Sequence, residues 1–188
     1  MDGLTELLLI AVVLGAVIVY LSSMAGRLDR LHHRLESTHA ALDAQLLRRG
    51  AAANELATSG FLDPASAFAV SGATQDALLV EPDDDDGRWA AESELTRALG
   101  LVFSSREDLD EMRESAGSDA AVADQLLDEL AVACRRVELA HRFHNDVVRS
   151  TLQVRRKRIV RWFRLAGYTP LPVTADFDDT VPPGLADG

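Results

Sequence analysis

AVADQLLDELAVACRRVELAHRFHNDVVRST, residues 121–151, is the stretch that decides the fold. Small and apolar residues recur along it in steps of four and three, which is the spacing of one face of a helix packed against other helices. The residues on this face are Val122, Leu126, Leu130, Ala133, Val137, Ala140, His144, Val147 and Thr151. The spacing therefore predicts a long helix inside a helical bundle.

Two further helices are predicted near the start of the bundle. Leucines recur at helical spacing and predict a first helix that ends near Gly60; they are Leu28, Leu31, Leu35, Leu42 and Leu46. Asp63 followed by Pro64 is a cap and first-turn signal, and it predicts a second helix through about Leu79.

A third helix is predicted from residue 89 to about residue 103, and the acidic residues 104–118 that follow are ambiguous. Ala and Leu abound and aromatic residues make up only 5% of the chain, which favours helices over sheets. Fairly short connections force neighbouring helices to run in opposite directions. We therefore expect an all-α fold, an antiparallel up-and-down four-helix bundle.

The N-terminal stretch LTELLLIAVVLGAVIVYLSS, residues 4–23, predicts a membrane-spanning helix. About 20 residues at a rise of about 1.5 Å per residue cover the roughly 30 Å hydrocarbon core. A secretory signal peptide is one alternative, but Asp2 and Glu6 stand where its positive region would be, and no clear small-x-small cleavage motif follows. A buried soluble helix is the other alternative, but so small a domain would have little left to cover it.

Arg27, Arg30 and Arg34 follow this span, and no basic residue precedes it. The positive-inside rule then places the N-terminus outside and the rest of the chain in the cytoplasm. We expect a single-pass protein of the plasma membrane with three parts. These are an N-terminal segment with the span (residues 1–26), a cytoplasmic helical bundle that continues the first helix (27–167), and an acidic, proline-containing, disordered tail (168–188).

Charge, cysteine content and the absence of known motifs argue against several classes of function. The net charge of −11 argues against a general nucleic-acid binder, which needs a basic face for phosphate. The single cysteine, Cys134, excludes an intramolecular disulfide and fits a reducing compartment. The acidic run EPDDDDG, residues 81–87, lacks the ligand alternation of a calcium loop and predicts a solvated loop. Since the chain contains no nucleophile elbow, phosphate-binding loop or dinucleotide fingerprint, we expect neither an enzyme nor a cofactor.

A carboxylate bundle that binds two metal ions is the alternative that would make the chain an enzyme. Its ligands would be two E-x-x-H pairs and two further glutamates: Glu36 with His39, Glu138 with His141, Glu55 and Glu94. His141 lies beside an arginine-rich face, which disfavours a metal ion there. We expect no metal.

Three segments resemble LemA proteins, in the order that the family has them. LDAQLLRRGAAANELATSG (residues 42–60) is similar to the family's I-D-x-Q-L-x-R-R segment after an N-terminal membrane helix, ESELTRAL (92–99) to its E-x-x-L-x-x-A-L helix start, and VELAHRFHNDVV (137–148) to its A-R-x-x-Y-N-x-A-V signature. His144 replaces the family's tyrosine, and its second Tyr-Asn and its Phe-Pro-Ser-Asn are missing. The resemblance covers most of residues 28–164, and it implies a membrane-tethered up-and-down helical bundle with no established catalytic residues.

The first and third of these segments carry polar residues that would be costly to bury without partners. Asp43, Gln45, Leu46, Arg48 and Arg49 match the first motif, and Arg142, Asn145, Asp146 and Val148 lie in or beside the other. Arginine donates bidentately to carboxylates, so we expect a clasp that joins Gln45, Arg48 and Arg49 to Asn145 and Asp146. A polar patch that binds a ligand or a partner is the alternative.

The stretch RRKRIVRWFR, residues 155–164, follows the long helix. A helix that starts near residue 119 and runs antiparallel to the first helix returns to the bilayer near residue 151, so we expect this stretch to meet the anionic inner leaflet. The residues of this patch are Arg155, Arg156, Lys157, Arg158, Arg161, Trp162, Phe163 and Arg164. A solvated basic helix end is the alternative.

The function that these expectations favour is a membrane-anchored helical scaffold or interaction protein. Its expected partners are membrane lipid and an unidentified membrane or cytoplasmic protein, without nucleic acid, and homo-oligomerisation stays open. An accessory subunit of a membrane transporter or protease complex is the alternative in a different class.

Overall fold

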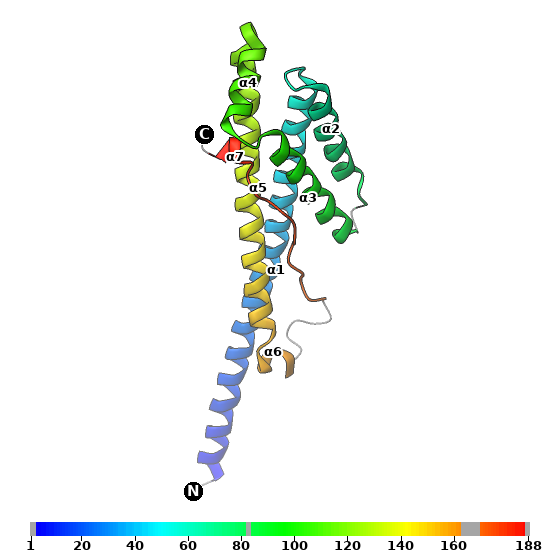
Figure 1. Ribbon diagram of the computed structural model, residues 1–188. Coiled ribbons are helices and arrows are strands. Elements are labelled where there is room, and N and C mark those ends of the chain that lie inside the picture. Colours follow the sequence, from blue (N-terminus) through cyan, green and yellow to red (C-terminus); the bar gives the residue numbers. More distant parts are fainter. Residues whose placement is uncertain (1–2, 82–83, 163–169, 187–188) are drawn as a thin grey trace. The chain divides into compact units, whose positions relative to one another are not determined.

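The computed structural model describes residues 3–81, 84–162 and 170–186, and this part of the chain is helical without any strand (Figure 1). The helices are α1 (Gly3–Thr58), α2 (Pro64–Leu79), α3 (Asp85–Val102), α4 (Arg106–Ala116), α5 (Ala120–Arg155), α6 (Arg158–Trp162) and α7 (Pro183–Ala186). A 3-10 turn, Gly117–Asp119, precedes α5. The all-α expectation is confirmed.

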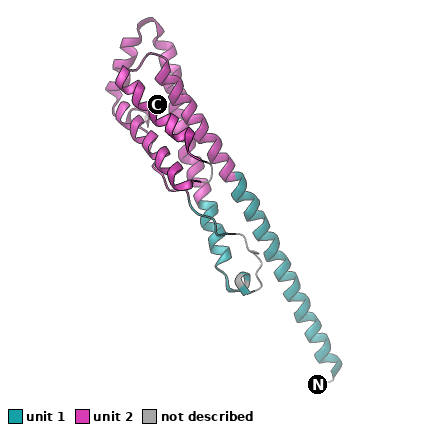
Figure 2. Cartoon of the chain, turned by 90° about the vertical axis from the view of Figure 1, so that its right-hand side faces the viewer, with its two compact units in different colours: residues 1–37, 146–174 teal, residues 38–145, 175–188 magenta. Residues whose placement is uncertain are grey.

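The chain divides into two compact units (Figure 2). Unit 1 comprises residues 1–37 and 146–174, and unit 2 comprises residues 38–145 and 175–188. Helices α1 and α5 each contribute one part to each unit.

The ends of α1 and α2 lie where the turn and cap residues predict them. Gly60 follows α1 with a φ of 87°, a left-handed conformation that glycine adopts without steric cost. Asp63 caps α2, because its carboxylate accepts the backbone N–H groups of Ala65 at 2.9 Å and Ser66 at 3.2 Å. A hydrogen bond with the side chain of Ser66, together with these two backbone bonds, lowers the pKa of Asp63.

The acidic run was expected to be a loop, but its second half forms the first turn of α3. Asp84 accepts the N–H of Gly87 at 2.9 Å, and Asp85 and Asp86 occupy the first turn. Carboxylates there interact favourably with the positive end of the helix dipole.

The ambiguous acidic segment contains a helix of its own, α4. Ser105 and Asp108 form a capping box in which each side chain accepts from the backbone N–H of the other. The side chains of Leu109 and Met112 are buried on one face of this otherwise polar helix. Gly117 ends it with a φ of 52°.

The main core of unit 2 takes side chains from α1, α2, α3, α4 and α5. Its largest members are Leu56, Val70, Leu95, Leu99, Phe103, Leu109, Met112, Leu127 and Leu130. Cys134 is also buried in this core, and burial raises the pKa of its thiol. Along α5 the predicted seam is buried or half-buried from Leu126 onward, whereas Val122 is exposed and Ala123 is buried in its place.

The tail was predicted to be disordered, but residues 175–186 are packed within unit 2. Ala175 and Phe177 join a second cluster with Leu42, Trp89 and Val137. Leu185 of α7 joins the main core, and α7 packs against α4. Apolar side chains at alternate positions anchor this segment in spite of its acids and prolines.

Unit 1 contains the N-terminal part of α1, with an apolar stretch that is almost entirely exposed. Within the described residues, α1 is the one helix long and apolar enough to cross a membrane. After this stretch, Met24 and Leu28 of α1 pack with Val154 of α5 and Val160 of α6 in a small cluster.

Candidate functional site

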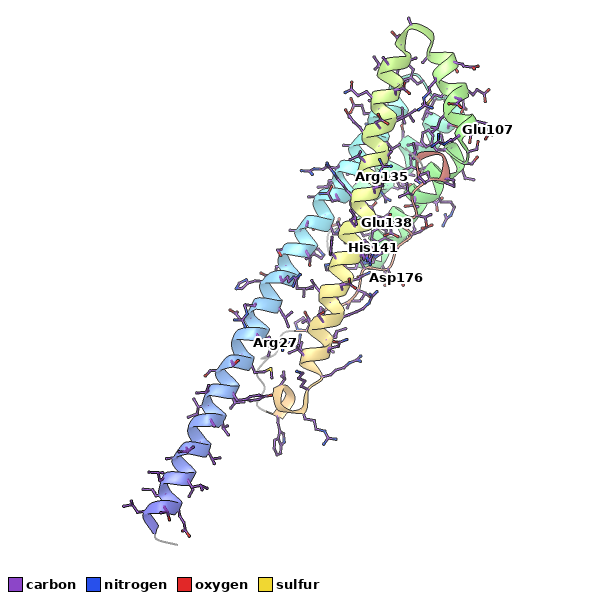
Figure 3. All side chains as sticks on the ribbon, turned by 90° about the vertical axis from the view of Figure 1, so that its left-hand side faces the viewer. Arg27, Glu107, Arg135, Glu138, His141 and Asp176 are labelled. Atoms are coloured by element: carbon purple, nitrogen blue, oxygen red, sulfur yellow. The ribbon has the colours of Figure 1, made fainter. Side chains whose placement is uncertain are left out.

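Residues 175–182 are extended and lead into α7; residues 175–185, here called the strap, lie on α3 and α5 within unit 2. Figure 3 labels Asp176 of the strap beside His141 of α5. The hydrogen bonds that hold the strap come from the helices' side chains and act largely on its backbone. Side chains that bond to a backbone in this way hold an extended peptide segment, which here is part of the same chain.

Asn145 on α5 holds the first residue of the strap. Its Nδ2 donates to the carbonyl oxygen of Ala175 at 2.9 Å, and its Oδ1 accepts the N–H of Ala175 at 3.0 Å. The side-chain amide thus replaces the backbone of a neighbouring strand. Both residues are buried, so neither backbone group of Ala175 is left to be satisfied by solvent.

His141, one helical turn before Asn145, contacts both ends of the same short stretch. Its Nδ1 lies 2.7 Å from Oδ2 of Asp179, and its Nε2 lies 3.0 Å from the carbonyl oxygen of Ala175 and 2.9 Å from Nδ2 of Asn145. A neutral ring donates to Asp179 and accepts from Asn145, whereas a protonated ring donates to both Asp179 and Ala175. The Asp179 carboxylate raises the pKa of His141.

Phe177 fills the space between the two helices. Its ring stacks on His141 with centroids 4.3 Å apart and on Trp89 of α3 with centroids 5.3 Å apart. The next residue, Asp178, is held through its backbone: its N–H donates to Oγ of Ser93 at 3.0 Å, and its carbonyl oxygen accepts from Oγ1 of Thr96 at 2.6 Å.

The end of the strap is held by two further bonds. Arg135 of α5 donates to the carbonyl oxygen of Leu185 at 3.1 Å, and the N–H of Gly184 donates to the carbonyl oxygen of Phe103 at 3.0 Å. A Cβ at Gly184 would lie 2.6 Å from the carbonyl oxygen of Ser105, so only glycine permits this approach.

The predicted clasp is wrong in its pairings. Arg49 is buried, but its Nη2 donates to Oε2 of Glu92 at 2.6 Å and its Nη1 to Oγ1 of Thr96 at 2.8 Å, both on α3. Asp146 is exposed and accepts from Arg149 at 3.0 Å on its own helix. The arginine therefore found its carboxylate on α3, because α3 faces the buried side of α1 in unit 2.

Gln45 and Arg48 lie on another side of α1, where they line an open groove of about 720 Å³ between α1 and α5 of unit 2. Oε1 of Gln45 and Nε of Arg49 are buried without a hydrogen-bond partner within the described part of the chain. The other residues of the groove are Ala51, Ala52, Glu55, Ala121, Asp124, Gln125, Asp128, Glu129, Val132, Ala133 and Arg136. Its arginines lie toward the Gln45 end, and its acids extend from the Glu55 end to the middle, where Ala51 and Ala52 contribute small side chains.

The predicted basic patch falls partly outside the described residues. The backbone of Phe163 and Arg164 and the side chain of Arg161 lie outside them. Arg155 donates to the carbonyl oxygen of Pro170 at 2.6 Å. The remaining members of the patch, Arg156, Lys157, Arg158 and Trp162, are exposed.

The E-x-x-H residues have other partners. His39 pairs with Asp43 at 3.2 Å, Glu36 with His32 at 3.2 Å, and His141 with Asp179. Over residues 3–81, 84–162 and 170–186, no three His, Cys, Asp or Glu side chains lie close enough together to hold a metal ion.

No family model, curated protein or solved structure matches this chain. The resemblance to LemA proteins therefore stays a prediction. Two of the segments that carry it are joined by the ion pair of Arg49 and Glu92.

Sequence analysis missed the strap and the residues that hold it. The signal was present in TADFDDTV, residues 174–181, where apolar residues alternate with polar ones as in an extended segment with one buried face. Ala175 and Phe177 are buried, and Asp176 and Asp178 between them are exposed.

Proposed function

We propose that this chain is a single-pass, membrane-anchored helical interaction protein, which spans the bilayer with the N-terminal part of α1 and presents an antiparallel bundle of α1, α2, α3 and α5 in the cytoplasm. The observation that carries the proposal is the exposed apolar stretch of α1. Leu7, Ile10 and Leu14 are 70%, 63% and 58% exposed, so nothing in the described part of the chain covers them. Lipid supplies the apolar surroundings that such a helix needs.

The groove between α1 and α5 is the face on which we place partner binding. Its small residues allow a helix to approach closely, and its two ends carry opposite charges, which favours one orientation of the partner. A helix with acids facing Arg48 and Arg136 and bases facing Glu55 and Asp128 has the complementary pattern. Binding, rather than catalysis, is the role that these side chains support.

Membrane extraction and site-specific cross-linking test this proposal. We expect the full chain to remain in membranes after washing with alkaline carbonate. A photo-reactive residue at Ala52, in the groove, should cross-link to a second polypeptide, whereas one at the exposed Ala69 of α2 should not. Reversing the charges with Arg48→Glu and Arg136→Glu should abolish the cross-link.

Release of the chain by carbonate would contradict the anchor, and equal cross-linking from both positions would contradict the groove. The identity of the cross-linked chain decides the alternative, because a transporter or protease subunit would make this protein an accessory subunit. A second copy of the chain would indicate homo-oligomerisation.

A further inference from the structure

Unit 1 has an open cavity of about 800 Å³ on the face of α1 that directly follows the apolar stretch. It is lined by Tyr20, Ser23, Met24, Arg27, Arg30, Leu31 and Arg34 of α1 and by Lys157. Each of these α1 residues has another three, four or seven positions away, so they share one helix face. Figure 3 labels Arg27 on this helix.

The cavity is strongly cationic. Four of its lining residues are arginine or lysine, and none is acidic. Among the described residues, no carboxylate lies within 4.0 Å of the charged groups of Arg27, Arg30, Arg34 or Lys157. The acids nearest in sequence, Asp29 and Glu36, pair with histidines at 3.9 Å and 3.2 Å. An anion in this cavity would relieve the repulsion among four like charges.

The connection between α5 and α6 holds Lys157 at this place. Val154 before it and Val160 after it are buried against Met24 and Leu28. The N–H of Lys157 donates to the carbonyl oxygen of Val154 at 3.2 Å, which forms a turn at the end of α5. Two segments far apart in the sequence therefore supply the charges, and the apolar cluster beneath them fixes their spacing.

The position along α1 indicates which anion fits. Arg27 lies about 6 Å and Arg34 about 16 Å beyond Ser23 along the helix axis. Because a headgroup layer is about 5–8 Å thick on each side of the hydrocarbon core, Arg27 lies at its level, and Arg30, about 10 Å beyond Ser23, lies just past it. Tyr20 is a side chain typical of this interface. Guanidinium groups bind phosphate oxygens bidentately.

We propose that this cavity binds the phosphate of an anionic phospholipid headgroup. The inference rests on the proposed function, because it needs α1 to span the bilayer. It differs from general attraction to a charged surface, since it assigns one lipid to one cavity built from α1 and Lys157.

Native mass spectrometry of the full chain in a neutral detergent tests the site. We expect a first phosphatidylglycerol to bind more tightly than later ones and more tightly than phosphatidylcholine. The variant Arg27→Gln/Arg30→Gln/Lys157→Gln should lose this tight binding by about 100-fold, at about fivefold for each cation. The matched control Arg97→Gln/Arg106→Gln/Arg142→Gln removes three exposed cations of unit 2 that lie outside both the cavity and the groove, and it should leave the tight binding unchanged.

The outcomes separate this inference from the proposed function. Release of the parent chain by alkaline carbonate would contradict the membrane anchor itself. Retention in membranes with equal binding of the two lipids, or equal losses in the triple variant and the control, would overturn the headgroup site alone. If inorganic phosphate or soluble glycerophosphoglycerol displaces the lipid at equal concentration, the site binds a soluble anion and the lipid assignment is wrong.

Discussion

The side-chain amide of Asn145 forms two hydrogen bonds with the backbone of Ala175, one as donor at 2.9 Å and one as acceptor at 3.0 Å. This relationship explains the asparagine in HND, residues 144–146. Its partners are Ala175 and His141 rather than an arginine on α1. It holds the C-terminal strap to α5.

Asn145→Ala should release the start of the strap. The buried N–H of Ala175 would lose its partner, at a cost of about 1–3 kcal/mol, and its carbonyl oxygen would keep only the contact with His141. We expect amide hydrogen exchange of residues 175–181 to accelerate at least tenfold while the core of unit 2 keeps its protection, as measured by mass spectrometry. Asp146→Ala, at the exposed neighbouring position, is the control and should change nothing. Equal effects of the two substitutions would show that the strap is not held by this amide.

The strap should also loosen as the pH rises. The Asp179 carboxylate raises the pKa of His141 in the folded protein. The stabilisation from this pair is therefore fully present below the unfolded histidine pKa of about 6.5 and is lost as the pH rises through the higher folded pKa. In a Trp162→Phe background, Trp89 emission should report earlier denaturant-induced release of Phe177 at pH 8 than at pH 6.

Asp179→Asn is the control for this pH dependence and should flatten it. His144 contributes with the opposite sign, because burial lowers its pKa and its stabilisation is lost below about pH 6.5. This contribution is present with and without Asp179, so the difference between the two proteins isolates His141. A pH dependence that survives Asp179→Asn would rule out the pair as its cause.

Breaking the buried ion pair of Arg49 and Glu92 should lower the free energy of unfolding strongly, whereas replacing both residues by apolar ones should lower it little. Glu92→Ala leaves the buried Arg49 without its carboxylate, and we expect a loss of about 3–5 kcal/mol in the free energy of unfolding. The double variant Arg49→Met/Glu92→Leu should recover most of this loss, because apolar residues of similar volume often replace such a pair well. Denaturant unfolding measures both.

The exposed pair of Asp146 and Arg149 offers a matched comparison. Both side chains are more than half exposed, and Arg149→Ala should cost about 0.5 kcal/mol or less. A similar cost for breaking the two pairs would mean that Arg49 reaches solvent.

Two glycines should respond to alanine in opposite ways. Gly184→Ala brings a Cβ to 2.6 Å from the carbonyl oxygen of Ser105, so the end of the strap must move. We expect a loss of about 1–3 kcal/mol and faster hydrogen exchange in α7. Gly100→Ala on α3 meets nothing within 4 Å, and it should stabilise the helix by about 0.5–1 kcal/mol. Thermal unfolding of each variant checks the two signs.

Sequence alone predicts the helices that carry strong local signals. Asp63 and Gly60 mark the ends of two helices through their own backbone chemistry, and the period of α5 follows from its leucines, valines and alanines. Helix α4 was missed because just two of its residues, Leu109 and Met112, are buried, so it shows no apolar period. The capping box of Ser105 and Asp108 was its signal.

The partners of buried polar residues were harder to predict. Arg49 was expected to need a carboxylate, and it has one, but the choice between Glu92 and Asp146 depends on which helix faces it. Local propensity carries no information on that choice. The strap was missed for a related reason: acids and prolines indicate disorder by composition, whereas the alternation of Ala175 and Phe177 is a weaker, local pattern.

From the contacts of the strap we infer an order of folding. Asp178 of the strap bonds to Ser93 and Thr96 of α3, which lie 85 and 82 positions before it in the chain. Such distant pairs close slowly, whereas contacts within and between successive helices form early. The platform that receives the strap, made by Trp89, Ser93 and His141, is therefore completed first. We expect capture of the strap, rather than helix formation, to be the last step to the native state.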